Sequence, residues 1–181
     1  MTERFDACLK VILQFEGGFS DDPVDRGGAT NKGIIQSEYN RYRARKNLDE
    51  RSVRFIEDDE VRDIYFNEYW LPSRCELMPP PLDLVMFDGA VNHGDGREMK
   101  FLQRSLDVTD DGVWGPKTNA ALQDALNKEG AESLASELIQ QRVLFYHRIV
   151  ENDSSQRKFL NGWLNRMSRL EIIMGDQHGT A

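Results

Sequence analysis

The sequence predicts a mainly helical fold with at most a small β-hairpin between residues 19 and 35. Apolar residues recur at three- and four-residue intervals through most of the chain, which is the spacing of an amphipathic helix. Residues 19–33 are rich in Asp, Gly, Pro, Thr and Asn, a composition typical of turns and irregular backbone. Almost no other segment alternates apolar and polar residues as a strand does, so we expect no large sheet.

The first helix is expected over residues 3–16. Its apolar side chains fall on one face, at Phe5, Leu9, Ile12 and Leu13. Glu16 continues the same face, and Gly17 and Gly18 follow it directly. Because glycine adopts left-handed backbone geometry at little cost and is common just past a helix end, we expect the helix to stop there.

The remaining helices follow from the same spacing and from the residues that flank them. Asp58 and its acidic neighbours suit the first turn of a helix, where the backbone carries partial positive charge. Pro79-Pro80-Pro81 and the turn Gly94-Asp95-Gly96 separate successive helices. Helices are expected over residues 37–46, 58–70, 82–91, 97–106, 116–126, 131–150 and 155–173, followed by a frayed tail over residues 176–181.

The composition excludes several classes of protein. The formal net charge is -8, so the chain lacks the basic field that draws proteins to nucleic acid or anionic membranes. No stretch approaches the roughly 20 apolar residues of a membrane span, and residues 1–6 do not resemble the start of a signal peptide. Asp107, Asp110 and Asp111 lack the ligand spacing of a calcium loop. We expect cytoplasmic synthesis, no nucleic-acid partner, no membrane insertion, no metal and no cofactor.

Glu16 is the first candidate for catalysis. Hydrolysis of a glycosidic bond usually needs one carboxyl group that stays protonated and donates to the leaving oxygen, and a second that is ionised. The apolar helical face predicts partial desolvation of Glu16, and a helix C-terminus carries partial negative charge. Both effects disfavour the charged form of the carboxyl group. A surface glutamate that ends a helix by chance fits the same spacing, so position alone leaves both interpretations open.

The second carboxylate must come from the loop that follows, where Asp21, Asp22 and Asp25 are available. Asp22 precedes a proline, which biases its backbone toward extended geometry, and Asp21 and Asp22 both suit an ordinary turn. Asp25 lies nine residues after the glutamate, so a hairpin can return it across a cleft. Thr30 and Asn31 are then placed to orient a water molecule. We predict that Asp25 is the second carboxylate, although a structural role fits it equally well.

Residues 16–34 resemble the signature of glycoside hydrolase family 108, a group of bacterial and phage N-acetylmuramidases. The similarity covers Glu-Gly-Gly, Asp-Pro, a second Asp, Gly-Gly-x-Thr-Asn and Gly-Ile in one unbroken register. It implies a lysozyme-like helical fold in which Glu16 is the catalytic glutamate. The resemblance also implies that the loop lines the substrate cleft, with Asp25 and Thr30 assisting catalysis and Asp22 and Asn31 binding substrate.

The sequence departs from related patterns at two positions. The glutamate–aspartate spacing resembles that of phage lysozymes in other families, whose threonine lies six residues beyond the aspartate. That position is Asn31 here, and Thr30 comes one residue early. Ile35 stands where the family generally has Thr or Ser, a natural helix N-cap. We expect Ser37 to take over the capping, at a cost of about 1 kcal/mol.

The C-terminal half carries a second resemblance. Residues 87–94, 110–118 and 159–166 are similar to the predicted peptidoglycan-binding segment that follows the catalytic segment in this family. The resemblances therefore divide the chain into a catalytic segment, residues 1–92, and a helical binding segment, residues 93–175, which we expect to pack as one globular unit.

Asn92 and His93, at the join of the two segments, are predicted to bind substrate. They fall in an Asn-His-Gly stretch that reads as a turn, so capping is the alternative role for His93. Trp70, Trp114 and Trp163 are able to stack on sugar rings, although tryptophans in helices mostly pack in the core.

Together these features predict a peptidoglycan hydrolase that cleaves the β-1,4 bond between N-acetylmuramic acid and N-acetylglucosamine, with glycan strands as its partner. A lytic transglycosylase and a non-catalytic wall-binding or phage structural module are the alternatives. A protein made in the cytoplasm that acts on the wall needs a release route of the holin type. The setting that we favour is therefore a phage or prophage, and the oligomeric state is left open.

Overall fold

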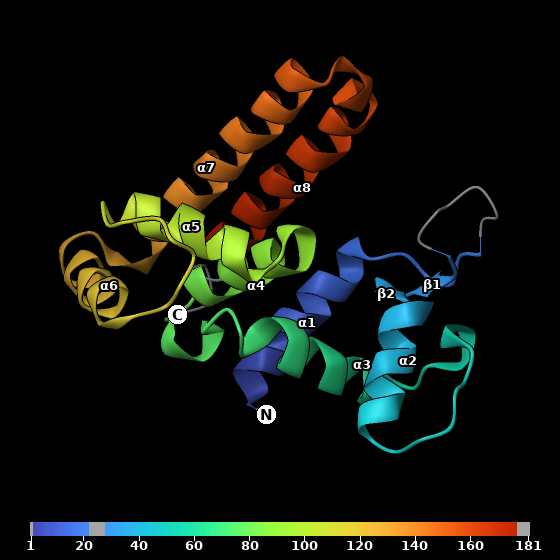
Figure 1. Ribbon diagram of the computed structural model, residues 1–181. Helices are drawn as coiled ribbons and strands as arrows, with labels where there is room; N and C mark the ends of the chain where they lie inside the picture. Colours follow the sequence, from blue (N-terminus) through green and yellow to red (C-terminus); the bar gives the residue numbers. More distant parts are fainter. Residues whose placement is uncertain (1, 22–27, 177–181) are drawn as a thin grey trace. The chain divides into compact units, whose positions relative to one another are not determined.

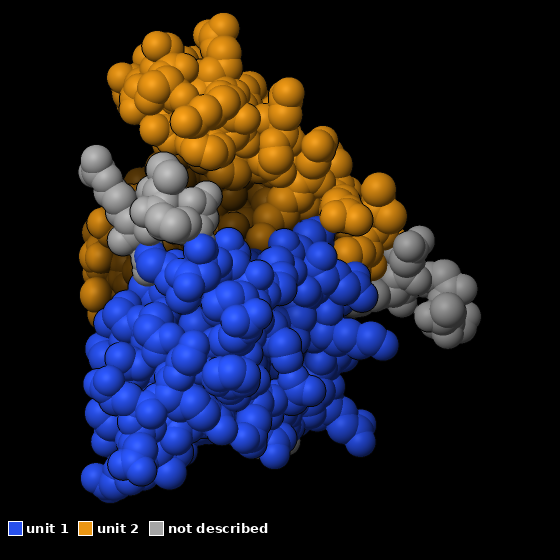
Figure 2. All heavy atoms as spheres, turned by 90° about the vertical axis from the view of Figure 1, so that its right-hand side faces the viewer, with its two compact units in different colours: residues 1–70 blue, residues 71–181 orange. Residues whose placement is uncertain are grey.

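The structure is a computed structural model that describes residues 2–21 and 28–176, with only the backbone for residue 176. The prediction of a mainly helical fold is confirmed, and the strands of the described residues form a two-stranded antiparallel sheet. The chain divides into two compact units, unit 1 with residues 1–70 and unit 2 with residues 71–181 (Figure 2).

Most of the long helices begin and end within a few residues of the predicted ranges. The short elements η1, η3 and η4 are 3₁₀ turns, and η2 continues α3 as a π-helical turn. In chain order the elements are α1 (Glu3–Phe15), β1 (Thr30–Asn31), β2 (Ile34–Ile35), α2 (Gln36–Arg45), η1 (Val53–Phe55), α3 (Asp58–Tyr65), η2 (Phe66–Trp70), η3 (Cys75–Leu77), α4 (Leu82–His93), α5 (Asp95–Ser105), α6 (Pro116–Lys128), α7 (Gly130–Asn152), η4 (Ser154–Gln156) and α8 (Arg157–Asp176) (Figure 1).

α1 forms because a capped N-terminus is followed by an apolar face. The side chain of Thr2 accepts a hydrogen bond from the backbone N–H of Phe5 (3.2 Å), which satisfies one donor of the first turn. Phe5 is fully buried and packs edge-on against Phe66 and Trp70, with ring centroids 5.0 and 5.4 Å apart. These contacts hold α1 against α3 and η2 in unit 1.

α1 stops before Gly17 as predicted, but without a left-handed glycine. Glu16 is the C-cap residue and has extended backbone (φ -84°, ψ 145°), whereas Gly17 and Gly18 are not among the residues with left-handed backbone. The expectation of a left-handed glycine was therefore wrong, because the chain leaves the helix one residue earlier. The carbonyl of Gly17 accepts a hydrogen bond from the N–H of Lys32 (3.1 Å), which ties this exit to the hairpin.

β1 and β2 form the small hairpin that the sequence predicted. The strands pair antiparallel, with Thr30 opposite Ile35. Lys32 and Gly33 make the turn and both have left-handed backbone (φ 50° and 77°), as a tight two-residue hairpin requires. Backbone hydrogen bonds of 2.9 and 2.8 Å between Ser20 and Thr30 attach the segment after α1 to β1.

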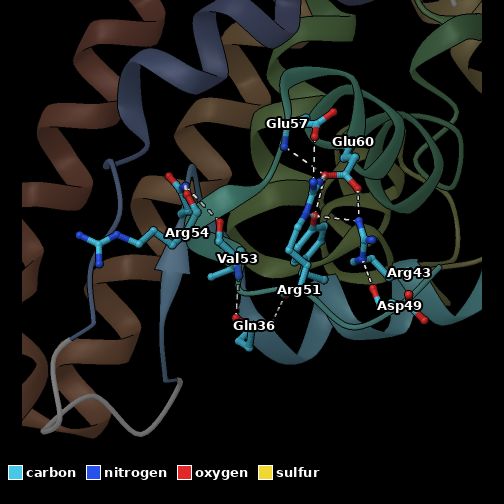
Figure 3. Close-up of polar contacts among 10 residues, drawn as sticks. Gln36, Arg43, Asp49, Arg51, Val53, Arg54, Glu57 and Glu60 are labelled. Atoms are coloured by element: carbon cyan, nitrogen blue, oxygen red, sulfur yellow. Dashed lines mark hydrogen bonds and ion pairs between the residues drawn. The ribbon is translucent and has the colours of Figure 1, made fainter.

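α2 begins without a side-chain cap. Ile35 is the N-cap residue, and Ser37 lies exposed inside the first turn, so the prediction that Ser37 caps this helix was wrong. The side chain of Gln36 holds the helix start instead, because it accepts a hydrogen bond from the N–H of Val53 (2.7 Å) and donates one to the carbonyl of Arg51 (2.9 Å) (Figure 3).

α4 forms the buried centre of unit 2. Every residue from Leu82 to Ala90 is buried, and the helix packs against both α5 and α7. α7 and α8 lie side by side (Figure 1). The predicted turn after this helix was placed too early, since Asn92 and His93 are its last residues and Gly94, with left-handed backbone (φ 85°), ends it.

α4 and α5 approach closely where Gly89 meets Glu98. A Cβ atom on Gly89 would lie 1.9 Å from Cδ of Glu98, so glycine leaves the room that this carboxyl group occupies. Burial raises the pKa of Glu98 to about 8. Burial also lowers the pKa of His93, whose Nε2 lies 3.8 Å from Oε2 of Glu98, to about 3. Both side chains are therefore mostly neutral at pH 7.

Candidate active site

Glu16 lies where α1 ends, directly against the hairpin turn. Its side chain is half-buried, in line with its place on the apolar face of the helix. A Cβ atom built on Gly33 would lie 2.9 Å from Oε2 of Glu16 and 3.2 Å from its Cδ. The carboxyl group therefore packs on the bare Cα of Gly33, in space that any larger side chain would take.

Tyr65 reaches the same place from α3. The Cβ position on Gly33 is also 2.6 Å from Oη of Tyr65, so the hydroxyl and the carboxyl of Glu16 flank the same glycine. Tyr65 is buried, and its Oη donates a hydrogen bond to the carbonyl of Lys32 (2.8 Å). Tyr65 thus holds the hairpin turn beside Glu16.

Tyr69 and Glu38 add a second pair of polar groups. Oη of Tyr69 donates a hydrogen bond to Oε1 of Glu38 (2.9 Å), and the rings of Tyr65 and Tyr69 lie 5.4 Å apart. Burial raises the pKa of Tyr69 well above its usual range, and the negative charges of Glu38 and Glu16 add to this effect. Burial also raises the pKa of Glu38. The site therefore contains a half-buried carboxyl group on α2 in addition to the one that ends α1.

Tyr65, Tyr69 and Glu38 were not among the residues predicted from the sequence. Tyr65 and Tyr69 lie four positions apart, which places them on one face of the predicted helix over residues 58–70. That spacing was a usable signal. Glu38 carried none, because an acidic residue in the first turn of a helix is ordinarily explained by the helix dipole.

The predicted loop residues have different surroundings. Asp22 and Asp25 lie outside the described residues. Thr30 is half-buried in β1. Asn31 is buried, and its side-chain amide donates hydrogen bonds to the carbonyl of Val53 (3.1 Å) and to that of the next residue (3.2 Å). The side chain of Asn31 therefore connects the hairpin to η1 by hydrogen bonds.

The loop that Asn31 contacts is held by a polar network centred on Glu60 (Figure 3). The carboxylate of Glu60 accepts hydrogen bonds from Oη of Tyr39 and from Nη1 of Arg43, both 2.6 Å long, and it pairs with Arg51. Burial alone would raise the pKa of Glu60, but these donors hold it below its usual value. The network fixes the loop before α3 and so supports the hairpin.

Asn92 and His93, the other predicted substrate-binding residues, belong to unit 2. Asn92 is exposed at the end of α4, where its side-chain amide donates a hydrogen bond to the carbonyl of Asp88 (2.6 Å). The side chain of His93 is nearly buried and packs among the rings of Phe101, Phe145 and Tyr146, with centroids 5.7 to 6.0 Å away.

Sequence models of two known families match the chain. The model of glycosyl hydrolase 108 matches residues 9–94, which contain Glu16, the hairpin, Tyr65 and Glu38. A second model, a predicted peptidoglycan domain, matches residues 97–168. The resemblance to glycosyl hydrolase 108 that the sequence predicted is therefore confirmed for residues 9–94. The two matches together support a peptidoglycan hydrolase.

The chain is also similar to a solved structure, that of SagA from Brucella abortus. The two sequences are 29% identical, the alignment covers 94% of this chain and 93% of the SagA chain, and the TM-score is 0.76. No curated protein matches the sequence. Because the alignment spans nearly the whole of both chains, the likeness includes both family segments.

The segment boundary predicted between residues 92 and 93 stays a prediction. The two family matches change over between residues 94 and 97, whereas the compact units change over between residues 70 and 71. α4 therefore belongs to the first family segment and to the second compact unit. Among the described helices, none is long and apolar enough to cross a membrane.

Replacement of Gly33 by alanine in this hydrolase is expected to lower activity on peptidoglycan by about 10²-fold, the cost of a misplacement of roughly 1 Å. Alanine is strained at the left-handed backbone of Gly33 (φ 77°), and its methyl group would displace Oε2 of Glu16 or Oη of Tyr65. Release of soluble fragments from purified sacculi measures the effect. The control is Gly18→Ala, because no atom lies within 4 Å of a Cβ there. Equal rates for the two variants would contradict the packing argument.

Proposed function

We propose that this peptidoglycan hydrolase is an N-acetylmuramidase that cleaves the β-1,4 bond between N-acetylmuramic acid and N-acetylglucosamine, with Glu16 as general acid. The observation that carries the proposal is the place of Glu16. It lies within the glycosyl hydrolase 108 segment, at the exit of α1, half-buried, with its carboxyl group against Gly33 and close to Tyr65.

The surroundings of Glu16 suit a proton donor. Its carboxyl group is partly shielded from water where α1 ends, beside the hairpin turn. Glu38, whose own pKa is raised by burial, shares the neighbour Tyr69 with Glu16. A protonated Glu16 donates its proton to the glycosidic oxygen as the bond to the muramic acid carbon breaks, and the bonding electron pair stays on that oxygen.

We propose Asp25 as the second carboxylate, with Thr30 assisting it. The support for Asp25 is its place in the sequence, nine residues after Glu16 and five before Thr30. Carboxyl groups about 5 Å apart act as acid and nucleophile, whereas a gap of about 6.5–9.5 Å leaves room for a water that the second group activates. We also propose that Asp22 and Asn31 bind substrate. Asn31 has a second role, because its side chain holds the hairpin against η1.

Product analysis tests the proposed reaction. Purified protein is incubated with sacculi, and the soluble fragments are identified by mass spectrometry. A muramidase leaves muropeptides with reducing N-acetylmuramic acid ends. Fragments with anhydro-muramic acid would instead establish a lytic transglycosylase, because that reaction closes the sugar onto itself without water. Sacculus binding without any fragments would establish a non-catalytic wall-binding module.

We also propose a biological setting for the protein. The setting that we propose for this peptidoglycan hydrolase is a phage or prophage, in which it acts as an endolysin that reaches the wall through a holin-type route. Lysis of a host strain that expresses the chain with and without a holin tests it, and lysis without a holin would contradict it.

A further inference from the structure

Unit 2 contains a pocket that lies apart in sequence from the catalytic loop. Its volume is about 170 Å³. The lining residues come from the end of α4, the start of α5 and the middle of α7 and α8, and they include Asn92, His93, Arg97, Phe145, Tyr146 and Trp163.

One wall of this pocket is aromatic and open to ligands. Trp163 is half-buried and stacks on Tyr146, with ring centroids 5.1 Å apart and planes inclined by 25°. Phe159, which is exposed, extends the same aromatic group, since its ring centroid lies 6.0 Å from that of Trp163. Tyr146 is itself buried and supports Trp163 from beneath, so the ring that remains partly accessible is that of Trp163. An accessible tryptophan face is suited to contact with the apolar face of a sugar ring.

The floor of the pocket is uncharged. His93 lines it, and burial, with the positive charge of Arg142 as a further cause, lowers the pKa of His93 to about 3. The imidazole is therefore neutral at physiological pH and packs as a ring against Phe145 and Tyr146. A neutral aromatic floor favours a sugar ring over a free cation or anion.

The rim of the pocket carries a cation and an acceptor. Arg97 is exposed, lies over the ring of Phe145 at 4.8 Å, and forms no ion pair with any carboxylate of the described residues. Its guanidinium group is thus available for a carboxylate. Asn92 uses its amide nitrogen inside α4, which leaves Oδ1 to accept a hydrogen bond, for example from an acetamido N–H.

We infer that this pocket binds an N-acetylated amino sugar that carries a carboxylate, with the sugar against Trp163 and the carboxylate on Arg97. The choice of ligand rests on the proposed function, because peptidoglycan supplies such units. The carboxylate has two possible sources in that polymer, the lactyl group of a peptide-free muramic acid and the acidic residues of a stem peptide.

Nuclear magnetic resonance of the ¹⁵N-labelled full-length protein tests this inference. The chain has three tryptophans, Trp70, Trp114 and Trp163, so three indole N–H signals report on separate places, and Trp163→Phe assigns the signal of the pocket. The first probe is the disaccharide N-acetylglucosaminyl-N-acetylmuramic acid, whose internal bond is not the one that a muramidase cuts. The second is the same disaccharide with a tetrapeptide stem, and the third is chitobiose, which has no carboxylate.

The expected result is a shift of the Trp163 signal with one or both carboxylate-bearing probes. Chitobiose should bind at least about tenfold more weakly than those probes. Arg97→Gln should lose this preference for a carboxylate. Which of the first two probes binds better identifies the source of the carboxylate. Arg148→Gln, an exposed arginine on α7, is the matched control and should bind as the wild type does. Arg97→Gln keeps the aromatic wall, so its result does not depend on a change in the core.

Two results would overturn the inference. The first is a Trp163 signal that stays in place while other signals move, which would confine binding to another part of the protein. The second is that the wild type binds chitobiose as tightly as the carboxylate-bearing probes and that Arg97→Gln binds those probes as tightly as the wild type does. The carboxylate would then play no part in recognition. Either result leaves the release of muropeptides by the wild type intact, so failure of the pocket and failure of the proposed muramidase are distinguishable.

Discussion

The variant Glu16→Gln is expected to release muropeptides from sacculi about 10²- to 10⁴-fold more slowly than the wild type, the usual contribution of a general acid. Glutamine keeps the size of the side chain and so keeps the packing against Gly33. Its amide is far too weak an acid to protonate the leaving oxygen, so the barrier to bond cleavage rises while substrate binding is retained. Release of reducing ends under initial-rate conditions measures the effect, and thermal unfolding of both proteins checks the fold.

Two further variants sharpen this experiment. Glu50→Gln removes an exposed carboxylate of the same unit and should leave the rate unchanged. Glu38→Gln retains the hydrogen-bonding shape at Tyr69 but removes a charge near Glu16, so we expect a smaller loss than for Glu16→Gln. A folded Glu16→Gln protein that works within a factor of about three of the wild type would exclude Glu16 as the acid, because general acids contribute far more than that.

The helices of this protein were predictable because apolar spacing alone specifies them. The segment predicted over residues 116–126 is α6 (Pro116–Lys128), and the one over residues 131–150 is α7 (Gly130–Asn152). Each of these helices buries one face, so its apolar residues recur with the helical period in the sequence. The small hairpin was predictable for a related reason, since a composition rich in turn-forming residues marked its place.

The helix ends were not predictable in the same way. Ser37 was expected to cap α2, but the helix start is held by Gln36 through contacts with Arg51 and Val53, far along the chain. The exit of α1 is likewise fixed by the bond between Lys32 and Gly17. Such ends depend on tertiary contacts, which local propensity does not contain.

The candidate site divides along the same line. Glu16 could be proposed from sequence because the helix that carries it and the motif that follows it are local features. Glu38 could not, because it joins the site only when α2 packs beside the hairpin, and for Tyr65 the sequence offered only its four-residue spacing from Tyr69. Asn31 was marked by the motif as a substrate-binding residue, but its side chain also makes a tertiary contact that the motif did not predict, with the backbone of η1.

The largest effect on stability is expected from Asp88→Asn in α4. Asp88 is completely buried and accepts hydrogen bonds from Nη2 of Arg142 and from Nε of Arg166, the latter 2.8 Å long. Burial alone would raise the pKa of Asp88, but the two guanidinium groups hold it below its usual value. Removal of this charge leaves Arg142, which is also fully buried, without its counter-charge, and we expect a loss of about 3–5 kcal/mol in the free energy of unfolding.

Urea unfolding at pH 7, followed by far-ultraviolet circular dichroism, measures this loss. The matched control is Asp110→Asn, which removes the same charge from a pair with Arg104 in which both side chains are partly exposed. Solvent and salt screen such a pair, so the midpoint should hardly move. The difference between the variants isolates burial as the cause, because the chemical change is identical. If Asp88→Asn unfolds at the same urea concentration as Asp110→Asn, then Arg142 is solvated or neutralised by another group, and the charge cluster contributes little to the stability of unit 2.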